Sequence, residues 1–169
     1  PQFVDSLADG PQILAIARPL EGGEISALRE LLEAGDRALL IMDDIDMAET
    51  LGALAGMGEP ELGEHDDGYS LLERIDFDHP ALAAFRDPRW RDFTDVHFWR
   101  HRVIDPADLP DDAKVIARFD SGAPAWIEVP VGDGALMVMM SGWHPRDSQL
   151  SLSTKFVPLL FSLFADAGP

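Results

Sequence analysis

The chain contains no cysteine among its 169 residues. This absence excludes disulfide bonds, thiolate zinc sites and every cysteine nucleophile. Basic residues are also scarce, because 13 Lys and Arg stand against 31 Asp and Glu, which gives a net charge of -18. Since nucleic-acid binding depends on neutralising phosphate charge, this balance predicts that no nucleic acid is a partner.

Long hydrophobic runs are missing as well. The nearest candidate, residues 156–164, is shorter than the roughly 18 apolar residues that a membrane span needs, and it contains Pro158 and Ser162. The chain opens at Pro1 without an initiator Met, and its first nine residues complete no predicted element. We therefore expect a single domain, residues 1–169, excised from a larger protein whose membrane-targeting segments lie outside it.

The first half of the chain alternates short apolar runs with amphipathic segments. Runs at 13–17 and 38–42 predict buried strands. Helices are predicted at 25–34, which Gly35 ends, and at 47–54. A strand–helix–strand–helix order with fully apolar strands is typical of a parallel sheet that is covered on both faces.

The second half predicts mostly strands. They are expected at 69–75, 96–104, 114–119, 125–131 and 135–140, with a helical turn at 79–85. The run 135–140 (ALMVMM) is apolar throughout and predicts a central strand buried on both faces. The hairpin 114–131 alternates instead, which places it at or near one edge of the sheet.

A final helix is predicted after a cap at Ser153 or Thr154. Its apolar residues cover more than one side. The stripe Phe156, Leu160 and Leu163, flanked by Leu159, predicts the side that packs on the core. An outer helix buries only one stripe, so Phe161 and Phe164 are expected to be partly exposed or covered by a neighbouring copy.

Three carboxylates, Asp43, Asp44 and Asp46, follow the apolar run 38–42. In open α/β sheets ligands sit outside the carboxyl ends of strands, and clustered carboxylates suit hard cations. The spacing matches neither an EF-hand nor the Asp-x-Ser-x-Ser pattern of a von Willebrand factor type A site. The alternative is helix capping by Asp44 or Asp46. These residues are ligand-site candidates, and no resident metal or cofactor is predicted.

A second polar group, His97, Trp99 and His101, would share one face of the strand predicted at 96–104. Histidine pairs on a strand sometimes bind zinc, but a third ligand is missing from the neighbouring sequence. Structural roles for these histidines are therefore favoured.

The segment 141–150 (SGWHPRDSQL) follows the most apolar strand. An aromatic ring, a proline and mixed charges are typical of a recognition loop. The alternative is a loop that only turns the chain onto its last helix. No Gly-x-Ser-x-Gly motif is present, so no catalytic residue is predicted. The candidate recognition residues are Trp143, His144, Arg146, Asp147 and Gln149.

Most of the chain resembles the C-terminal region of BatA-type, aerotolerance-regulator-like bacterial membrane proteins. The resemblance rests on VIARFDSGAPAWIEVPVGDGALMVMMSGWHP and SLSTKFVPLLFSLF, with FDHPALAAFRDPRW and AGDRALLIM upstream. It implies membrane helices in the parent protein and a domain similar to class I glutamine amidotransferases, which is a flavodoxin-like three-layer sandwich. Amidotransferases use a cysteine nucleophile, which this chain lacks, so their activity is not carried over.

Together these patterns predict an α/β fold with a mainly parallel sheet and a C-terminal antiparallel hairpin. We expect a non-catalytic interaction or structural domain of a membrane-anchored bacterial protein, on a side of the membrane that the sequence leaves open. Its partner would be a protein or a neighbouring domain of the parent, with weak self-association as a further option. A ligand- or metal-binding sensor is the alternative function, and a hydrolase the third.

Overall fold

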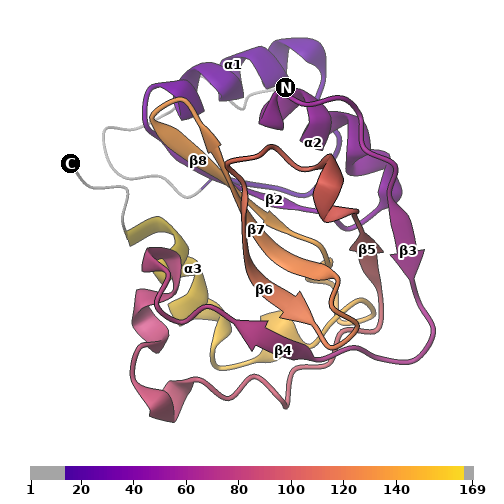
Figure 1. The fold of residues 1–169 in the computed structure, drawn as a ribbon, viewed down its shortest axis with the longest axis vertical. Coiled ribbons are helices and arrows are strands. Elements are labelled where there is room, and N and C mark those ends of the chain that lie inside the picture. The colour runs from indigo at the N-terminus through magenta and orange to yellow at the C-terminus, as the bar shows by residue number, and fades with distance from the viewer. Residues whose placement is uncertain (1–13, 166–169) are drawn as a thin grey trace.

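A computed structural model describes residues 14–165, which form two sheets and three α-helices (Figure 1). The six-stranded sheet consists, in spatial order, of β1 (Leu14–Ile16), β2 (Arg37–Ile41), β8 (Gly134–Met139), β7 (Pro124–Val131), β6 (Lys114–Phe119) and β4 (Leu72–Ile75). The small sheet pairs β3 (Gly63–His65) with β5 (His101–Val103). The α-helices are α1 (Gly22–Glu33), α2 (Ala48–Ala55) and α3 (Phe156–Ala165).

The large sheet is mixed. The strands β1, β2 and β8 pair in parallel, whereas β8–β7, β7–β6 and β6–β4 are antiparallel. Four strands, β1, β2, β8 and β6, therefore run in one direction. The α/β class and the central, doubly buried position of β8 are confirmed, and the hairpin β6–β7 lies one strand away from the β4 edge.

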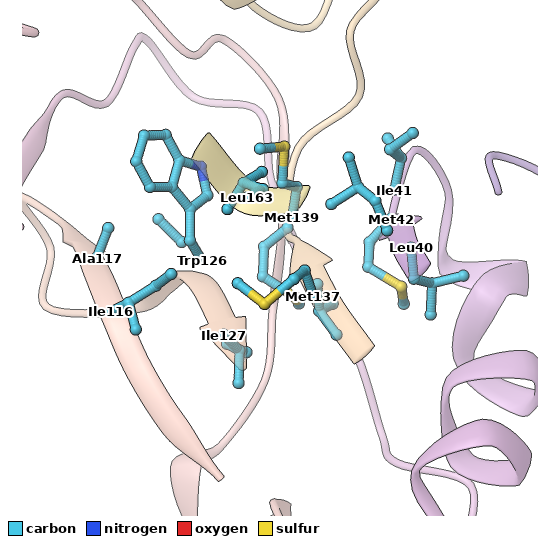
Figure 2. Packing of buried hydrophobic residues seen from close by; sticks show 14 of the residues in the cluster. Leu40, Ile41, Met42, Ile116, Ala117, Trp126, Ile127, Met137, Met139 and Leu163 are labelled. Carbon is cyan, nitrogen blue, oxygen red and sulfur yellow. The ribbon is translucent and has the colours of Figure 1, made fainter. Parts of the chain in front are cut away.

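Helical elements cover both faces of this sheet. The helices α1 and α2 contact β2, β7 and β8 on one face. On the other face lie α3 and the 3-10 segment η2 (Pro80–Phe85), which contact each other. Figure 2 shows Leu163 of α3 beside Trp126 and Met139. Because side chains alternate along a strand, Ile127, the neighbour of Trp126, points to the opposite face (Figure 2).

Strand β1 is less buried than predicted. It forms one edge of the sheet, so Ala15 is exposed and only Ile16 is fully buried. Ile13, the first residue of the predicted run, lies outside the described residues. An apolar run of this length does not distinguish an edge strand from a central one.

The long strand predicted at 96–104 is wrong. Only β5 is regular, while Phe98 forms isolated bridges with Ser70 and Ser148. The reason is that the backbone before β5 bonds to a loop rather than to a strand: Trp99 N–H donates to the carbonyl of Asp147 at 2.8 Å. Side chains still alternate between the two sides around Phe98, but no continuous ladder of strand hydrogen bonds runs through 96–104.

The helix α3 is rotated relative to the prediction. Leu159 and Leu163 are fully buried, whereas Leu160, which was predicted to face the core, is only half-buried. Ser162 Oγ accepts a hydrogen bond of 3.1 Å from the backbone N–H of Ala84 in η2, which turns the 159–163 side inward. The predicted exposure of Phe161 is confirmed, because 66% of it is accessible. Phe164 is half-buried.

None of the helices between residues 14 and 165 has both the length and the apolar character needed to cross a bilayer.

Candidate functional site

The carboxyl ends of β2 and β8 meet at Gly142. A Cβ atom on Gly142 would lie 2.5 Å from Asp147 Oδ2 and 3.1 Å from Asp43 Cβ. The glycine therefore allows Asp43, which follows β2, to approach Asp147 of the predicted recognition loop. Two regions that were separate candidates in the sequence come together at the edge where α/β proteins usually bind ligands.

Strand β5 closes over this edge through Arg102. Its backbone N–H donates to the carbonyl of Met140, and its Nη1 donates to the carbonyl of Asp43, both at 2.7 Å. The guanidinium is fully buried. Within residues 14–165 its Nε and Nη2 have no hydrogen-bond partner, although Glu64 Oε1 lies 3.7 Å from Nη2.

Two further ion pairs surround Arg102. Arg100 Nη2 lies 2.5 Å from Glu64 Oε1, and Arg100 Nη1 lies 3.2 Å from Asp147 Oδ1. The carboxylate of Asp147 is nearly inaccessible, so this second pair is largely shielded from water. We call the set Asp43, Glu64, Arg100, Arg102 and Asp147 the carboxyl-edge cluster.

The pKa values of two cluster members, Asp43 and Arg100, are shifted. Partial burial raises the pKa of Asp43, and the nearby carboxylates of Asp46, Asp44 and Asp147 raise it further. In contrast, the hydrogen bond to Glu64 raises the pKa of Arg100, because it favours the charged guanidinium. The cluster therefore places carboxylates and guanidinium groups together at the carboxyl end of the sheet.

The three predicted carboxylates separate in the structure. Asp44 is the N-cap of a 3-10 turn at Ile45–Met47 and accepts a hydrogen bond of 3.4 Å from the backbone N–H of Asp46. Asp46 itself is exposed, and only Asp43 of the three belongs to the cluster. In the part of the chain that the structure describes, no three His, Asp or Glu side chains are placed to hold a metal ion.

The predicted recognition loop also divides into two parts. His144 and Arg146 are exposed. Trp143 is half-buried and packs edge-to-face on Phe156, with 4.8 Å between ring centroids. Asp147 and Gln149 instead hold the segment that leads into β5. Asp147 binds Arg100, and Gln149 Oε1 lies 2.7 Å from His97 Nδ1.

The predicted common face holds for His97 and Trp99, whose rings stack, but it is wrong for His101. His101 lies inside, where its ring stacks on Phe119 at 3.9 Å and its Nε2 lies 3.2 Å from Ser70 Oγ. Burial lowers the pKa of His101 to about 4. His97 and Trp99 remain half-buried at the surface, because regular strand pairing begins only at His101 and the alternation of faces around Phe98 does not continue to that residue.

Arg102, Arg100 and Glu64 were not predicted as members of a site. One signal was present: two arginines interrupt a segment, 96–104, whose other residues are mainly apolar or aromatic. A guanidinium within such a segment must find partners when it is buried.

The fold and the cluster define an α/β protein with a mixed sheet whose carboxyl edge is crossed by ion pairs. No protein-family model and no curated protein matches the sequence. Similar solved structures include Cytoplasmic Protein STM3548 from Salmonella typhimurium, with a TM-score of 0.64 and 14% identity over 90% of this chain and 70% of that one. Cytoplasmic Protein STM1381 from Salmonella typhimurium LT2 has a TM-score of 0.59 and 12% identity over 86% of this chain.

The chain spans only 61% of the second of these proteins. The TM-scores of 0.64 and 0.59 show a shared fold, and at identities of 14% and 12% this likeness carries no statement about activity.

Proposed function

We propose that the chain is a non-catalytic interaction or structural domain of a membrane-anchored bacterial protein. The observation that carries this proposal is the outward side of α3. Val157 and Phe161 lie one helical turn apart and are 57% and 66% exposed. Phe164, three residues after Phe161, is half-buried and lies at the helical spacing that continues this side of α3. We call Val157, Phe161 and Phe164 the α3 apolar face.

Such a face favours a protein contact. Isolated exposed apolar residues are ordinary, but aromatic rings grouped with an aliphatic side chain on one helix are typical of a binding surface. Phenylalanine buries a large area when a partner covers it, and it loses little side-chain entropy. The partner is a protein or a neighbouring domain of the parent, and a weak dimer through the same face is the alternative occupant.

A flavodoxin-like fold is part of the same proposal. Parallel strands β1, β2 and β8, with helical elements on both faces, support a flavodoxin-like, amidotransferase-like sandwich. The membrane-anchored parent rests on the resemblance of 114–164 to BatA-type proteins.

The carboxyl edge of the sheet supports a role without catalysis. A nucleophile at the end of β8 would need room for its side chain, but a Cβ at Gly142 already meets Asp147. Arg102 and Arg100 lie across the same edge and are held by backbone and carboxylate oxygens. The sequence contains no cysteine that could act as the amidotransferase nucleophile.

Site-specific photo-crosslinking in the intact parent tests this proposal. A photoreactive phenylalanine analogue is placed at Phe161, and a matched one at Trp90, which is exposed but lies outside the α3 apolar face. We expect position 161 to give a defined crosslink to one protein, or to another part of the parent, that position 90 does not give. Identical products from both positions, or none from position 161, would contradict the proposal.

Ligand sensing at the carboxyl-edge cluster is the second candidate function. It is favoured by Arg102, whose Nε and Nη2 are buried and lack hydrogen-bond partners among residues 14–165. A ligand that binds only the folded state raises the melting temperature. A thermal-shift series with divalent cations and small carboxylates tests it: a rise that is lost in Asp43→Asn supports sensing, and an unchanged melting temperature opposes it.

A further inference from the structure

Three aromatic rings form a continuous surface at the start of the β4 and β5 segments. Tyr69 packs edge-to-face on His97, with 4.4 Å between ring centroids, and His97 stacks against Trp99 at 6.1 Å with planes 17° apart. Tyr69 is 54% exposed, and His97 and Trp99 are half-buried. We call these three residues the aromatic shelf.

The backbone explains why these rings face outward. Phe98 exchanges hydrogen bonds with Ser70, from Phe98 N–H at 3.0 Å and from Ser70 N–H at 2.8 Å. Side chains alternate across such a bridge, so the Phe98 ring is buried and its neighbours His97 and Trp99 point the other way. Because the bridge is antiparallel, Tyr69, which precedes Ser70, lies on the same side as His97 and Trp99.

Gln149 holds the central ring in one orientation. Its Oε1 accepts from the backbone N–H of His97 at 3.0 Å and from the ring Nδ1 at 2.7 Å. Since Nδ1 carries the proton in this bond, the neutral ring presents its lone pair at Nε2. The shelf therefore combines two π-faces with a hydrogen-bond acceptor between them, and it requires little ordering when a ligand binds.

The charge around the shelf is mainly negative. Asp66 and Asp67 are exposed and stand just before Tyr69, and the side chain of Asp95, two residues before His97, is 73% exposed. Of the neighbouring cations, Arg100 is paired with Glu64 and Asp147, and Lys155 lies 3.4 Å from Asp95. With a net charge of -18 over the whole chain, this surface favours a cationic ligand.

We propose that the aromatic shelf binds an arginine side chain of a protein partner. The guanidinium lies against the Tyr69 and Trp99 rings and donates a hydrogen bond to His97 Nε2. Arginine suits this surface better than lysine, because its planar cation stacks on aromatic faces and is more weakly hydrated. This inference rests on the proposed interaction function, and it names the chemistry that the partner contributes.

A titration followed by NMR tests the proposal. The 15N-labelled chain is titrated with a short glycine-spaced peptide that holds two arginines, and with matched peptides that hold lysine or citrulline, the uncharged analogue of arginine. We expect saturable shifts at residues 69 and 97–99 with the arginine peptide. Binding should be about five-fold weaker with lysine, as the loss of a stacked cation–π contact implies, and undetectable with citrulline.

Substitutions distinguish binding at the aromatic shelf from general attraction of the arginine peptide to the acidic surface. Tyr69→Ala and Trp99→Phe should each weaken binding of the arginine peptide, the first by about five-fold. Trp90→Ala removes an exposed ring outside the shelf and should change nothing. Because Tyr69 is mostly exposed, its variant keeps the fold, which the dispersion of the spectrum checks.

Three results would overturn the inference. The first is equal binding of the arginine peptide by wild type and Tyr69→Ala. The second is non-saturating shifts spread over the acidic surface. The third is saturable binding of a neutral disaccharide at residues 69 and 97–99 without binding of the arginine peptide, which would assign the shelf to carbohydrate. A crosslink from Phe161 that persists in Tyr69→Ala would leave the interaction function standing while the arginine site fails.

Discussion

Arg102 of β5 donates a hydrogen bond from Nη1 to the carbonyl oxygen of Asp43, across 2.7 Å, at the point where β2 ends. Together with the hydrogen bond from the Arg102 backbone N–H to the carbonyl of Met140, this contact joins the small sheet to the carboxyl edge of the large one. It also brings a fully buried cation to the backbone of Asp43, the residue whose carboxyl pKa is raised by burial.

Removal of this guanidinium should destabilise the fold. Arg102→Ala leaves the Asp43 carbonyl without its donor and leaves a space in the protein interior, so we expect a loss of more than about 2 kcal/mol in the free energy of unfolding. Arg146→Ala, whose side chain is 69% exposed, should change stability by less than about 0.5 kcal/mol. Urea denaturation followed by circular dichroism measures both, and equal values would show that the Arg102 contact is not structural.

Gly142 should tolerate no side chain. Gly142→Ala forces a Cβ to within 2.5 Å of Asp147 Oδ2, so we expect a loss of about 1–3 kcal/mol. Gly23→Ala is the matched control, because no atom lies within 4 Å of its Cβ position and alanine favours the helix α1. We expect Gly23→Ala to leave the urea midpoint unchanged or to raise it. A stable Gly142→Ala variant would mean that Asp147 can move away from Asp43.

The two sides of α3 should respond differently to substitution. Leu159→Ala creates a cavity in the core and should cost about 2–5 kcal/mol, whereas Leu160→Ala should cost less because Leu160 is half-buried. Phe161→Ser should leave the unfolding free energy nearly unchanged and improve solubility. If Phe161→Ser unfolds the chain as severely as Leu159→Ala, the α3 apolar face belongs to the core.

The stability of the chain should depend on pH through His101. Its pKa in the folded state is about 4, below the usual value of about 6.5 in an unfolded chain. Between these two pKa values the unfolded chain binds a proton at His101 that the folded chain does not. The neutral His101 therefore makes its full contribution to the free energy of unfolding above pH 6.5, and this contribution is lost as the pH falls toward 4. We expect it to be on the order of 3 kcal/mol.

Comparison with His101→Gln isolates this contribution, because other titrating groups contribute almost equally to both proteins. Urea midpoints at pH 7 and pH 4.5 should converge more in the variant than in the wild type. An unchanged pH dependence in the variant would show that His101 is protonated in the folded state.

The chain should release no ammonia from glutamine. The amidotransferase reaction needs a thiol nucleophile, and the sequence contains none. A coupled ammonia assay on the purified chain measures this. Glutamine-dependent release that a point mutation within the chain abolishes would refute the prediction.

Local patterns predicted the large sheet better than the site. The apolar run 135–140 was sufficient to place β8 at the centre, because only a strand buried on both faces tolerates six apolar residues in succession. The rotation of α3 could not be predicted, because it depends on the hydrogen bond between Ser162 and the distant Ala84.

The carboxyl-edge cluster could not be predicted from the sequence for a similar reason. Asp43 and Asp147 were each identified as candidates, but their approach at Gly142 depends on the pairing of β2 with β8. The burial of Arg102 was not predicted, because the strand expected at 96–104 does not continue through residues 97–100 and no local pattern shows which groups would hold a buried guanidinium.

The pairing of β2 with β8 also sets the order in which the chain can fold during synthesis. Arg37 pairs with Ala135, so one edge of β2 stays unpaired until β8 has been synthesised and has left the ribosome. Until then that edge presents unpaired backbone groups and the apolar residues Leu39 and Leu40 to other nascent chains. Translation speed between β2 and β8 should therefore influence how much of this protein reaches its native state.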